Sequence, residues 1–409
     1  MSRPLNVTLI TVGSRGDVQP MLALALALRR RGHTVRLGAP PDFRDWIAGH
    51  GFECGAVGRE IKPFLTGPAF QGSPSARTRA FWRFLREQIP VQMHDVRGLC
   101  EGADVVAWAG VAFGAVSVAE KAGLPLLGVT YTTCMLPSDR HPSPDVSRRD
   151  LPAWVNRLMW RLGPPFAALV LDPAINRARA GLGLPPMRFF DHFQCPWAIA
   201  ADPVLLPPDP QWPPRIQPAS FIYFDDDSQA LDPDLDAWLD DGEPPVFVGF
   251  GSMPTPHIER IEQVLREAIG ALGRRCLVAA GWAGLGGRGL PPGWRVAHGD
   301  LPHHRLFPRV AAVVHHGGSG TTAAALRAGV PQLVLPLILD QHHHAHHLHL
   351  AGLGPKPVPM GRIDARQLAD SLRYMLNQPP DLRARTAARL KQSDGCGDVA
   401  RRLESLAVP

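Results

Sequence analysis

Residues 6–40, NVTLITVGSRGDVQPMLALALALRRRGHTVRLGAP, decide the fold class of this chain. The first apolar run ends in glycine, a stretch rich in leucine and alanine follows, and TVRLGAP is a second apolar run. Strand, helix and strand at this spacing predict a parallel pair of strands joined by a right-handed crossover. We expect the helix to start at Pro20, because proline suits a first helical position, and to stop at Gly32.

The same alternation continues along the chain. Strands are expected at 103–110 and 125–132, with a helix between them, and residues 151–182 are mostly helical. A proline-rich stretch at 203–218, followed by an acidic one, indicates an interdomain linker. The alternation then restarts, with strands expected at 245–252, 275–282, 294–299, 311–316 and 331–337. The pattern therefore predicts two open parallel α/β sheets, with a helical tail from about 380.

Composition narrows the class of protein. The 409 residues exceed the usual size of one core, and 45% hydrophobic with 20% charged residues is ordinary for a globular protein. The net charge of +6 comes without a block of like charge, so nucleic acid is not expected as a partner. Six widely spaced cysteines fit reduced thiols in the cytoplasm. We expect the N-terminal apolar run to be a strand rather than a signal peptide, and we expect no transmembrane segment.

The motif HHGGSGTT, residues 315–322, lies between an expected strand and an expected helix. Its glycines permit close backbone approach, and the N–H groups that begin a helix favour an anion, most often phosphate. Thr321 and Thr322 are expected to cap that helix. A plain capped turn is the alternative, but it leaves the two histidines unexplained. Neither the Walker A motif nor the dinucleotide motif GxGxxG fits the spacing.

Three motifs in one order support a family resemblance. Residues 311–341, which end in the pair Asp340-Gln341, resemble the donor-binding segment of family 1 glycosyltransferases, which have the GT-B fold. GSRGDVQP at 13–20 resembles the acceptor-side loop of bacterial members that act on antibiotics, glycolipids and sterols. GFGSM at 249–253 resembles their strand-end serine loop.

The resemblance implies an inverting hexosyltransferase that uses a UDP- or dTDP-sugar and a hydrophobic small-molecule or lipid acceptor. It implies no metal and no other cofactor. The expected parts are an acceptor-binding Rossmann-like domain at 1–215, a nucleotide-sugar domain at 216–390, and a helix at 391–409 that returns to the first domain. The implied donor-binding residues are Ser14, Gly251, Ser252, His316, Gly318, Ser319, Gly320, Thr321, Asp340 and Gln341.

Asp17 is the expected catalytic base. A positioned carboxylate that takes the proton of an attacking hydroxyl contributes roughly 10²–10⁴-fold to the rate. Asp17 stands where relatives carry a histidine or an aspartate, although a helix N-cap would explain it too. The expected acceptor-binding residues are Thr130, Tyr131, Thr132, Phe81 and Trp82.

The chain departs from the family pattern at the nucleoside. Ala324 occupies the position where relatives often carry a ribose-binding glutamate, so the choice between UDP and dTDP stays open. The side chain that stacks on the base is expected within 298–308, without assignment to one residue.

Several other stretches of the sequence could have a binding function. The histidine run at 342–349 could bind zinc or nickel, although adventitious nickel binding is favoured over a physiological site. Residues 225–227, three aspartates, could mimic the metal-binding carboxylates of other glycosyltransferase folds, but their place in the linker favours a solvated acidic run. The basic, aromatic stretch 75–90 is expected to wall the acceptor pocket, and peripheral membrane contact is left open. Trp154, Trp160 and Phe166 are expected in a helix core, and contact with the acceptor is the alternative.

Rival functions remain for a sequence of this kind. A nucleotide-sugar epimerase of similar fold would need no acceptor pocket, and a nucleotide-sugar-binding protein without activity would not need Asp17. A dehydrogenase lacks its dinucleotide motif. The acceptor, the sugar and the oligomeric state are not determined by the sequence.

Overall fold

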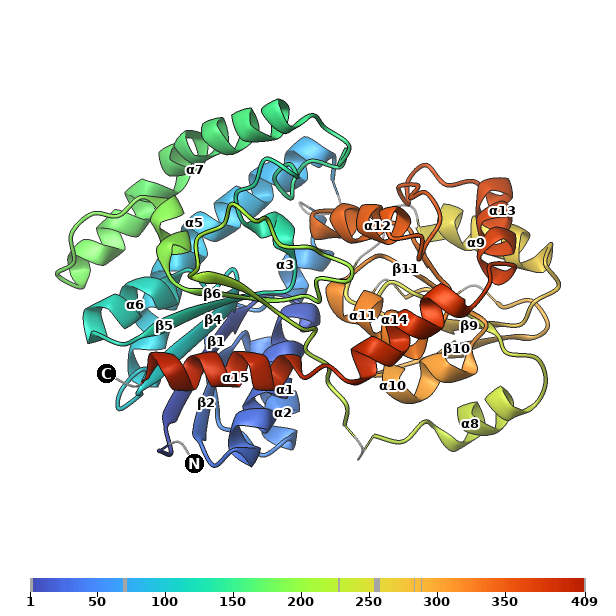
Figure 1. The fold of residues 1–409 in the computed structure, drawn as a ribbon, viewed down its shortest axis with the longest axis horizontal. Coiled ribbons are helices and arrows are strands. Elements are labelled where there is room, and N and C mark those ends of the chain that lie inside the picture. The colour runs from blue at the N-terminus through green and yellow to red at the C-terminus, as the bar shows by residue number, and fades with distance from the viewer. Residues whose placement is uncertain are drawn as a thin grey trace.

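The computed structural model describes residues 3–68, 72–226, 229–253, 258–282, 284–287 and 289–407. They form two α/β domains, each around a sheet in which every strand pair is parallel (Figure 1). The strand order is β3-β2-β1-β4-β5-β6-β7 in the N-terminal sheet and β10-β9-β8-β11-β12 in the C-terminal sheet. The predicted fold class, two Rossmann-like domains, is therefore confirmed.

The strands of the N-terminal sheet are β1 Asn6–Val12, β2 Thr34–Ala39, β3 Cys54–Ala56, β4 Val105–Gly110, β5 Leu126–Thr130, β6 Trp197–Ala200 and β7 Ile216–Ala219. Those of the C-terminal sheet are β8 Val246–Gly249, β9 Cys276–Ala279, β10 Trp294–Ala297, β11 Ala312–His315 and β12 Gln332–Val334.

The helices of the first domain are α1 Arg15–Arg30, α2 Arg44–Gly49, α3 Lys62–Thr66, α5 Pro74–Leu99, α6 Gly114–Ala122 and α7 Ala153–Gly181. The later helices are α8 Pro233–Asp240, α9 Ile258–Gly270, α10 His303–Leu306, α11 Ser319–Ala328, α12 Asp340–Leu350, α13 Ala365–Leu376, α14 Asp381–Lys391 and α15 Gly395–Leu406. Short 3₁₀ turns lie at Pro41–Phe43, Thr133–Met135, Phe189–Gln194 and Phe307–Arg309.

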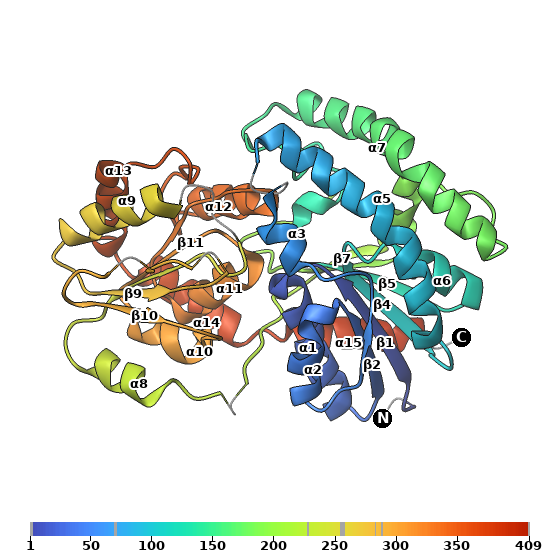
Figure 2. The same ribbon diagram turned by 180° about the vertical axis from the view of Figure 1, so that it is seen from behind.

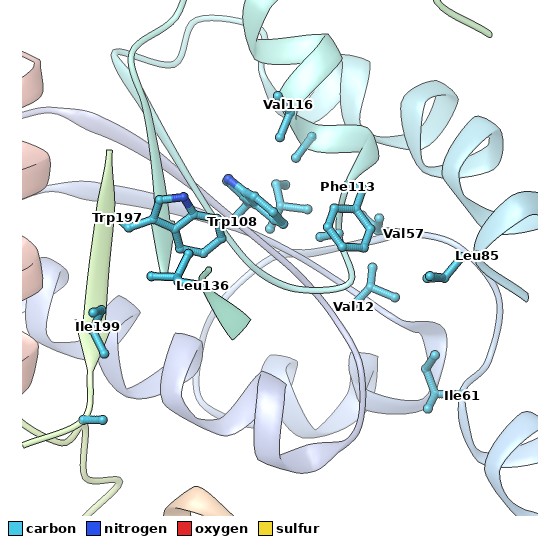
Figure 3. Packing of buried hydrophobic residues seen from close by; sticks show 14 of the residues in the cluster. Val12, Val57, Ile61, Leu85, Trp108, Phe113, Val116, Leu136, Trp197 and Ile199 are labelled. Carbon is cyan, nitrogen blue, oxygen red and sulfur yellow. The ribbon is translucent and has the colours of Figure 1, made fainter. Parts of the chain in front are cut away.

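The core of the first domain lies on both faces of its sheet. On one face, Trp108 of β4 packs edge-on against Trp197 of β6 at 5.0 Å between ring centroids, and Phe113 lies beside it (Figure 3). On the other face, α1 and α15 cover β1 and β4. Burial on both faces explains why the central strands read as continuous apolar runs.

Two details of the N-terminal domain differ from the sequence prediction. Helix α1 starts at Arg15, not at Pro20, because the side chains of Ser14 and Asp17 form a capping box and hold Pro20 inside the helix. Strand β7 falls within the proline-rich stretch assigned to the linker, so the N-terminal sheet continues to Ala219. As an edge strand, β7 tolerates the missing N–H of Pro218.

The chain ends on the first domain. After α14, helix α15 lies against α1, β4 and β6 (Figure 1). Its Glu404 carboxylate accepts hydrogen bonds from Arg31 at 2.7 Å and from the buried His33 at 2.8 Å. The Nδ1 atom of His33 accepts from the Leu5 N–H, so its Nε2 carries the proton. The hydrogen bonds from Arg31 and His33 lower the pKa of Glu404 to about 2.

Glu404→Gln is expected to destabilise the protein by roughly 2 kcal/mol at pH 7. Because the folded-state pKa lies below the ordinary value of 4.5, this stabilisation is complete above pH 4.5 and is lost as pH falls through about 2. Thermal melts of the parent and of Glu404→Gln at pH 7 measure the effect. Glu60→Gln, at an exposed position, is the control. Equal melting temperatures for all three proteins would contradict it.

Candidate active site

The three motif loops follow strands at the positions where the strand order of each sheet reverses. The order reverses between β1 and β4 in the first sheet, and between β8 and β11 in the second. Open parallel sheets bind ligands in the crevice at such positions, beyond the carboxyl ends of the strands. GSRGD follows β1, GSM follows β8 and HGGSG follows β11. The topology therefore assigns all three loops to the kind of place where this fold binds ligands.

Asp17 is held at the first turn of α1. Its Oδ2 accepts hydrogen bonds from the backbone N–H of Ser14 at 2.8 Å and from the Ser14 hydroxyl at 3.3 Å. Ser14, not Asp17, is the N-cap residue, which corrects the alternative reading of Asp17 as a cap. Gly110, at φ +64°, passes so close to Oδ1 that a Cβ there would lie 3.2 Å from it. Among the described residues, no donor bonds to Oδ1.

The environment of Asp17 makes its carboxyl a weak acid. Its pKa rises from 3.8 to about 7, first because the group is removed from bulk water and second because Asp340 adds negative charge nearby. The hydrogen bonds from Ser14 oppose the rise. The side chain is partly exposed. A carboxylate with a pKa near neutrality is suited to accept a proton at neutral pH.

The backbone of Asp17 is also fixed from the sheet. Its carbonyl accepts hydrogen bonds from the hydroxyls of Thr11 at 3.1 Å and of Tyr131 at 3.2 Å. Tyr131, predicted to contact the acceptor, thus supports the helix turn that carries Asp17.

His315 and His316 have different surroundings. His315 is fully buried, donates from Nε2 to Gln332 at 3.0 Å and accepts from the Gly317 N–H. His316 is partly exposed, and its buried Nδ1 has no hydrogen-bond partner among the described residues. Burial, with a further contribution from His344, lowers the pKa of His316 to about 4, so its imidazole is neutral at pH 7. His316 thus has an unused polar atom, whereas His315 does not.

The N-terminus of α11 offers backbone donors. Gly318 is the N-cap and has no capping side chain, so the N–H groups of Ser319, Gly320 and Thr321 have no capping partner. The expectation that Thr321 and Thr322 cap the helix is wrong, because Thr322 instead donates to the Gly318 carbonyl at 2.9 Å. A Cβ on Gly318 would lie 2.6 Å from Nε2 of His316, which requires glycine there. The turn thus combines unused N–H groups with an adjacent imidazole.

The loop after β8 lies against the same imidazole. A Cβ on Gly251 would lie 3.4 Å from Cε1 of His316. The Gly251 carbonyl accepts from the backbone N–H of Trp282, whose ring lies 5.8 Å from Nζ of Lys62 in the first domain. Ser252 follows Gly251 and is partly exposed. The predicted donor residues of two separate loops therefore meet at His316.

Asp340 begins α12 after a strained residue. Leu339 has φ +48°, a conformation that side chains rarely adopt and that marks functional turns. Asp340 is partly exposed, whereas Gln341 is buried and its carboxamide oxygen accepts from the N–H groups of Leu337 and Ile338 at 2.8 and 3.0 Å. Only the amide nitrogen of Gln341 is left to donate to a ligand.

One positioning residue and one buried arginine were not predicted from the sequence. His344, one turn after Asp340, donates from Nδ1 to the Gly317 carbonyl at 2.8 Å and so ties α12 to the loop of His316. Arg149 is buried and bonds through Nη1 to two carbonyls of its own loop, while its Nε and Nη2 have no partner among the described residues. The i,i+4 spacing of Asp340 and His344 was a signal for the first; no local pattern marks Arg149.

The two domains touch across the site. The Ser319 hydroxyl donates to the Tyr131 carbonyl at 2.9 Å, and Thr133 bonds to Nε2 of His343 at 2.7 Å. Arg15 of α1 forms an ion pair with Asp300 of the second domain. These contacts hold the loop after β1 next to the loops after β11 and β12.

Two of the three aspartates in the run 225–227 have partners from other elements. Asp225 is exposed and forms a two-pronged ion pair with Arg327 of α11, whereas the largely buried Asp226 bonds to Nε2 of His50 at 3.1 Å. The expectation of a solvated run is therefore wrong for Asp226 only. Asp227 lies outside the described residues.

The predicted acceptor residues differ in placement. Thr130 and Thr132 are buried, and their hydroxyls bond within their own turn to the Thr132 carbonyl and the Cys134 sulfur. Phe81 and Trp82 of α5 are partly buried against the core, and Trp82 meets Phe166 of α7 edge-on at 6.2 Å. The hydroxyls of both threonines are thus already bonded, whereas Phe81 and Trp82 keep part of their surface exposed.

Two further features could bind a ligand by their composition, the histidine run of α12 and a cavity beside β2 and β3. Within the described residues, no group of three or more histidine, cysteine, aspartate or glutamate side chains could hold a metal ion, although the histidine run of α12 lies at the domain interface. A cavity of about 680 Å³ is lined by Arg36, Arg44, Glu53 and Glu101, at the amino ends of β2 and β3. It lies at the end of the sheet opposite to Asp17, so the chemistry does not involve it.

Two stretches of the chain match known families. Residues 7–133 match the glycosyltransferase family 28 N-terminal domain, and residues 268–404 match the erythromycin biosynthesis protein CIII-like C-terminal domain. Two relatives from Amycolatopsis orientalis align over almost all of both chains. Glycosyltransferase GtfE is 36% identical and covers 97% of this chain and 96% of its own. Vancomycin aglycone glucosyltransferase is 35% identical, and the alignment covers 98% of this chain and 97% of the relative.

More distant similarity extends to plants and to solved structures. Sterol 3-beta-glucosyltransferase UGT80A2 from Arabidopsis thaliana is 30% identical over 96% of this chain and 64% of its own length. The structure of the glycotransferase of kitacinnamycin has a TM-score of 0.74 at 18% identity, covering 99% of this chain and 100% of that one. SsfS6 from Streptomyces sp. SF2575, solved with thymidine diphosphate, has a TM-score of 0.66 at 18% identity, covering 98% and 99%.

The fold and the arrangement of the loops define a glycosyltransferase of the GT-B type. The chain belongs to the family that includes bacterial antibiotic glycosyltransferases and sterol glucosyltransferases. The resemblance drawn from the three motifs is confirmed.

Proposed function

We propose that this enzyme transfers a hexose from a UDP- or dTDP-sugar to a hydroxyl of a hydrophobic acceptor, with inversion at the anomeric carbon. One observation carries the proposal: Tyr131 donates its hydroxyl to the Asp17 carbonyl at 3.2 Å, and its own carbonyl accepts from the Ser319 hydroxyl at 2.9 Å. The turn that carries the proposed base and the turn proposed to hold the diphosphate are therefore joined through one residue, which supports their action on the same substrates.

In the proposed reaction, the Asp17 carboxylate takes the proton of the acceptor hydroxyl while the hydroxyl oxygen attacks the anomeric carbon. The bond from that carbon to the diphosphate breaks, and its electron pair leaves with the diphosphate. The N–H groups that begin α11 and the neutral His316 would stabilise the charge that develops there. A single displacement of this kind inverts the configuration.

Donor and acceptor classes follow from the relatives. SsfS6 was solved with thymidine diphosphate, and two of the relatives are named for transfer to a vancomycin aglycone and to a sterol. Calorimetry with UDP and dTDP, followed by transfer assays with both glucose donors on a glycopeptide aglycone and a sterol, tests the proposal. NMR of the product then gives the anomeric configuration. Retained configuration, or no binding of either nucleotide, would refute it.

The site is proposed to work without a metal or another cofactor. The positive end of α11 supplies the charge stabilisation that a divalent cation supplies elsewhere. We expect transfer rates to change by less than about twofold after EDTA treatment. Loss of a catalytic metal would raise the reaction barrier by several kcal/mol and slow transfer far more than that. Addition of Mg²⁺ or Mn²⁺ to the treated enzyme is the control, and strong reactivation by either ion would overturn this part of the proposal.

A cytoplasmic location belongs to the same proposal, since all six cysteines are unpaired thiols. In the described part of the chain, no helix combines the length and apolarity needed to cross a membrane. The relatives are glycosyltransferases by name, so we propose neither an epimerase nor an inactive binding protein.

A further inference from the structure

Helix α7 carries an apolar stripe on its outer face. Five of the nine exposed large apolar side chains among the described residues belong to this helix. They are Trp154 (66% exposed), Leu158 (46%), Leu162 (61%), Phe166 (59%) and Leu169 (78%). Their spacing of four, four, four and three residues puts them on one side of the helix, over about 22 Å. The expectation that Trp154 and Phe166 are core residues is therefore wrong.

All five side chains stay exposed in the described chain, although Trp82 of α5 contacts Phe166. Figures 1 and 2 show α7 as the outermost element of the N-terminal domain, with α5 running beside it. The buried side of α7, with Ala167, Leu171 and Ile175, packs into the core of that domain. Helix α7 thus has two apolar sides. One packs in the core of the domain, and the other is exposed to solvent. A contiguous exposed apolar patch marks an interaction surface.

The charges around the stripe indicate what kind of surface it meets. Residues 74–90 and 153–171 contain six arginines and one acidic residue, Glu87. Arg79, Arg83 and Arg86 are exposed and repeat at the spacing of one face of α5. Trp82, between them in sequence, contacts Phe166 of the stripe, so the helix that carries these arginines lies beside the stripe. Arg157 and Arg161 are exposed on α7 itself, and Arg157 pairs with Asp139.

We propose that the outer face of α7, flanked by the arginines of α5, docks on the surface of an anionic lipid bilayer. Apolar side chains on one helix face with cations beside them match the acyl and headgroup layers of such a membrane. A protein partner or a second copy of this chain would have to supply acidic groups around an apolar groove. The docking does not depend on the identity of the sugar or of the acceptor.

Sedimentation with sucrose-loaded vesicles tests the proposal. The protein is expected to bind vesicles that contain phosphatidylglycerol and to bind pure phosphatidylcholine at least about tenfold less, with binding weakened by salt. The variant Leu158→Gln, Leu162→Gln, Leu169→Gln should lose most of the binding. The affinity of the variant Arg79→Gln, Arg83→Gln, Arg86→Gln for these vesicles should fall at least about tenfold, since each arginine near an anionic membrane contributes about fivefold to the affinity.

Matched controls place equal changes elsewhere. Leu350→Gln, Tyr374→Gln, Leu382→Gln removes three exposed apolar side chains from the second domain, and Arg362→Gln, Arg366→Gln, Arg385→Gln removes three exposed arginines. Both should bind vesicles like the parent, and thermal melts should show all four variants folded. Equal loss in control and α7 variants, no vesicle binding by the parent, or a dimer in light scattering that the leucine variant dissociates would each overturn the proposal.

Transfer to a water-soluble phenol separates this inference from the proposed function. The parent, the leucine variant and both controls should transfer sugar to it at similar rates, because Leu158, Leu162 and Leu169 are exposed side chains of α7 and none of them belongs to the predicted site. If the parent binds vesicles but transfers no sugar, the proposed function fails while the docking surface stands.

Discussion

Asp17→Asn is expected to reduce sugar transfer by about 10²–10⁴-fold while nucleotide affinity stays within about twofold. Asparagine keeps the size of the side chain and an oxygen for the N–H of Ser14, but it cannot accept the proton of the acceptor. Initial rates with saturating donor, together with calorimetry of UDP or dTDP, measure both quantities. Full transfer activity in this variant would remove Asp17 as the base.

The pH dependence of transfer adds a second test of the same residue. Because burial and Asp340 raise the pKa of Asp17 to about 7, the carboxyl is protonated and inactive below that pH. The value of kcat/KM should therefore rise as pH increases through about 7 and level off above it. Asp340→Asn removes the negative charge that helps to raise the pKa, so the midpoint should move to lower pH. A midpoint that does not move would show that the profile belongs to another group.

Gly318→Ala and His316→Ala are expected to weaken nucleoside diphosphate binding by about 10- to 100-fold, the usual effect of losing one hydrogen bond to a charged group. The two changes act on one contact, because a Cβ on residue 318 would lie 2.6 Å from Nε2 of His316 and displace the ring. The double variant should therefore bind about as weakly as either single variant. Calorimetry with UDP and dTDP measures all three.

Gly270→Ala serves as the control for this series. It adds the same methyl group at the end of α9 in the same domain, where nothing lies within 4 Å of the new atom. Its nucleotide affinity should equal that of the parent. Additive losses in the double variant would mean that Gly318 and His316 act on different contacts, and unchanged affinity of His316→Ala would exclude the imidazole from the phosphate site.

Several features of the site could be predicted because they are local. The glycine-rich turn after β11, the Asp-Gln pair after β12 and the aspartate after β1 each follow an apolar run, and the ends of such runs are visible in the sequence. In a parallel sheet these ends share one edge. The different burial of His315 and His316 also follows from their positions, the first as the last residue of β11 and the second beyond it.

Other features depend on contacts between distant segments, which no local pattern contains. The closeness of Asp17 to Asp340 joins loops more than three hundred positions apart and exists only because the two domains face each other. The hydroxyls of Thr130 and Thr132 looked available at a strand end, yet they bond inside their own turn. Trp154 and Phe166 looked like core residues, because a helical period does not tell which apolar side is covered.

The sequence by itself determined the two parallel sheets and the loops that bear polar groups, since backbone propensity and apolar periodicity act over a few residues. Only the tertiary structure decided which of those groups meet, which are already bonded and which apolar face stays uncovered. Those outcomes depend on burial and electrostatic fields summed over both domains, and a carboxyl such as Asp17 acquires its raised pKa only when the chain has folded around it.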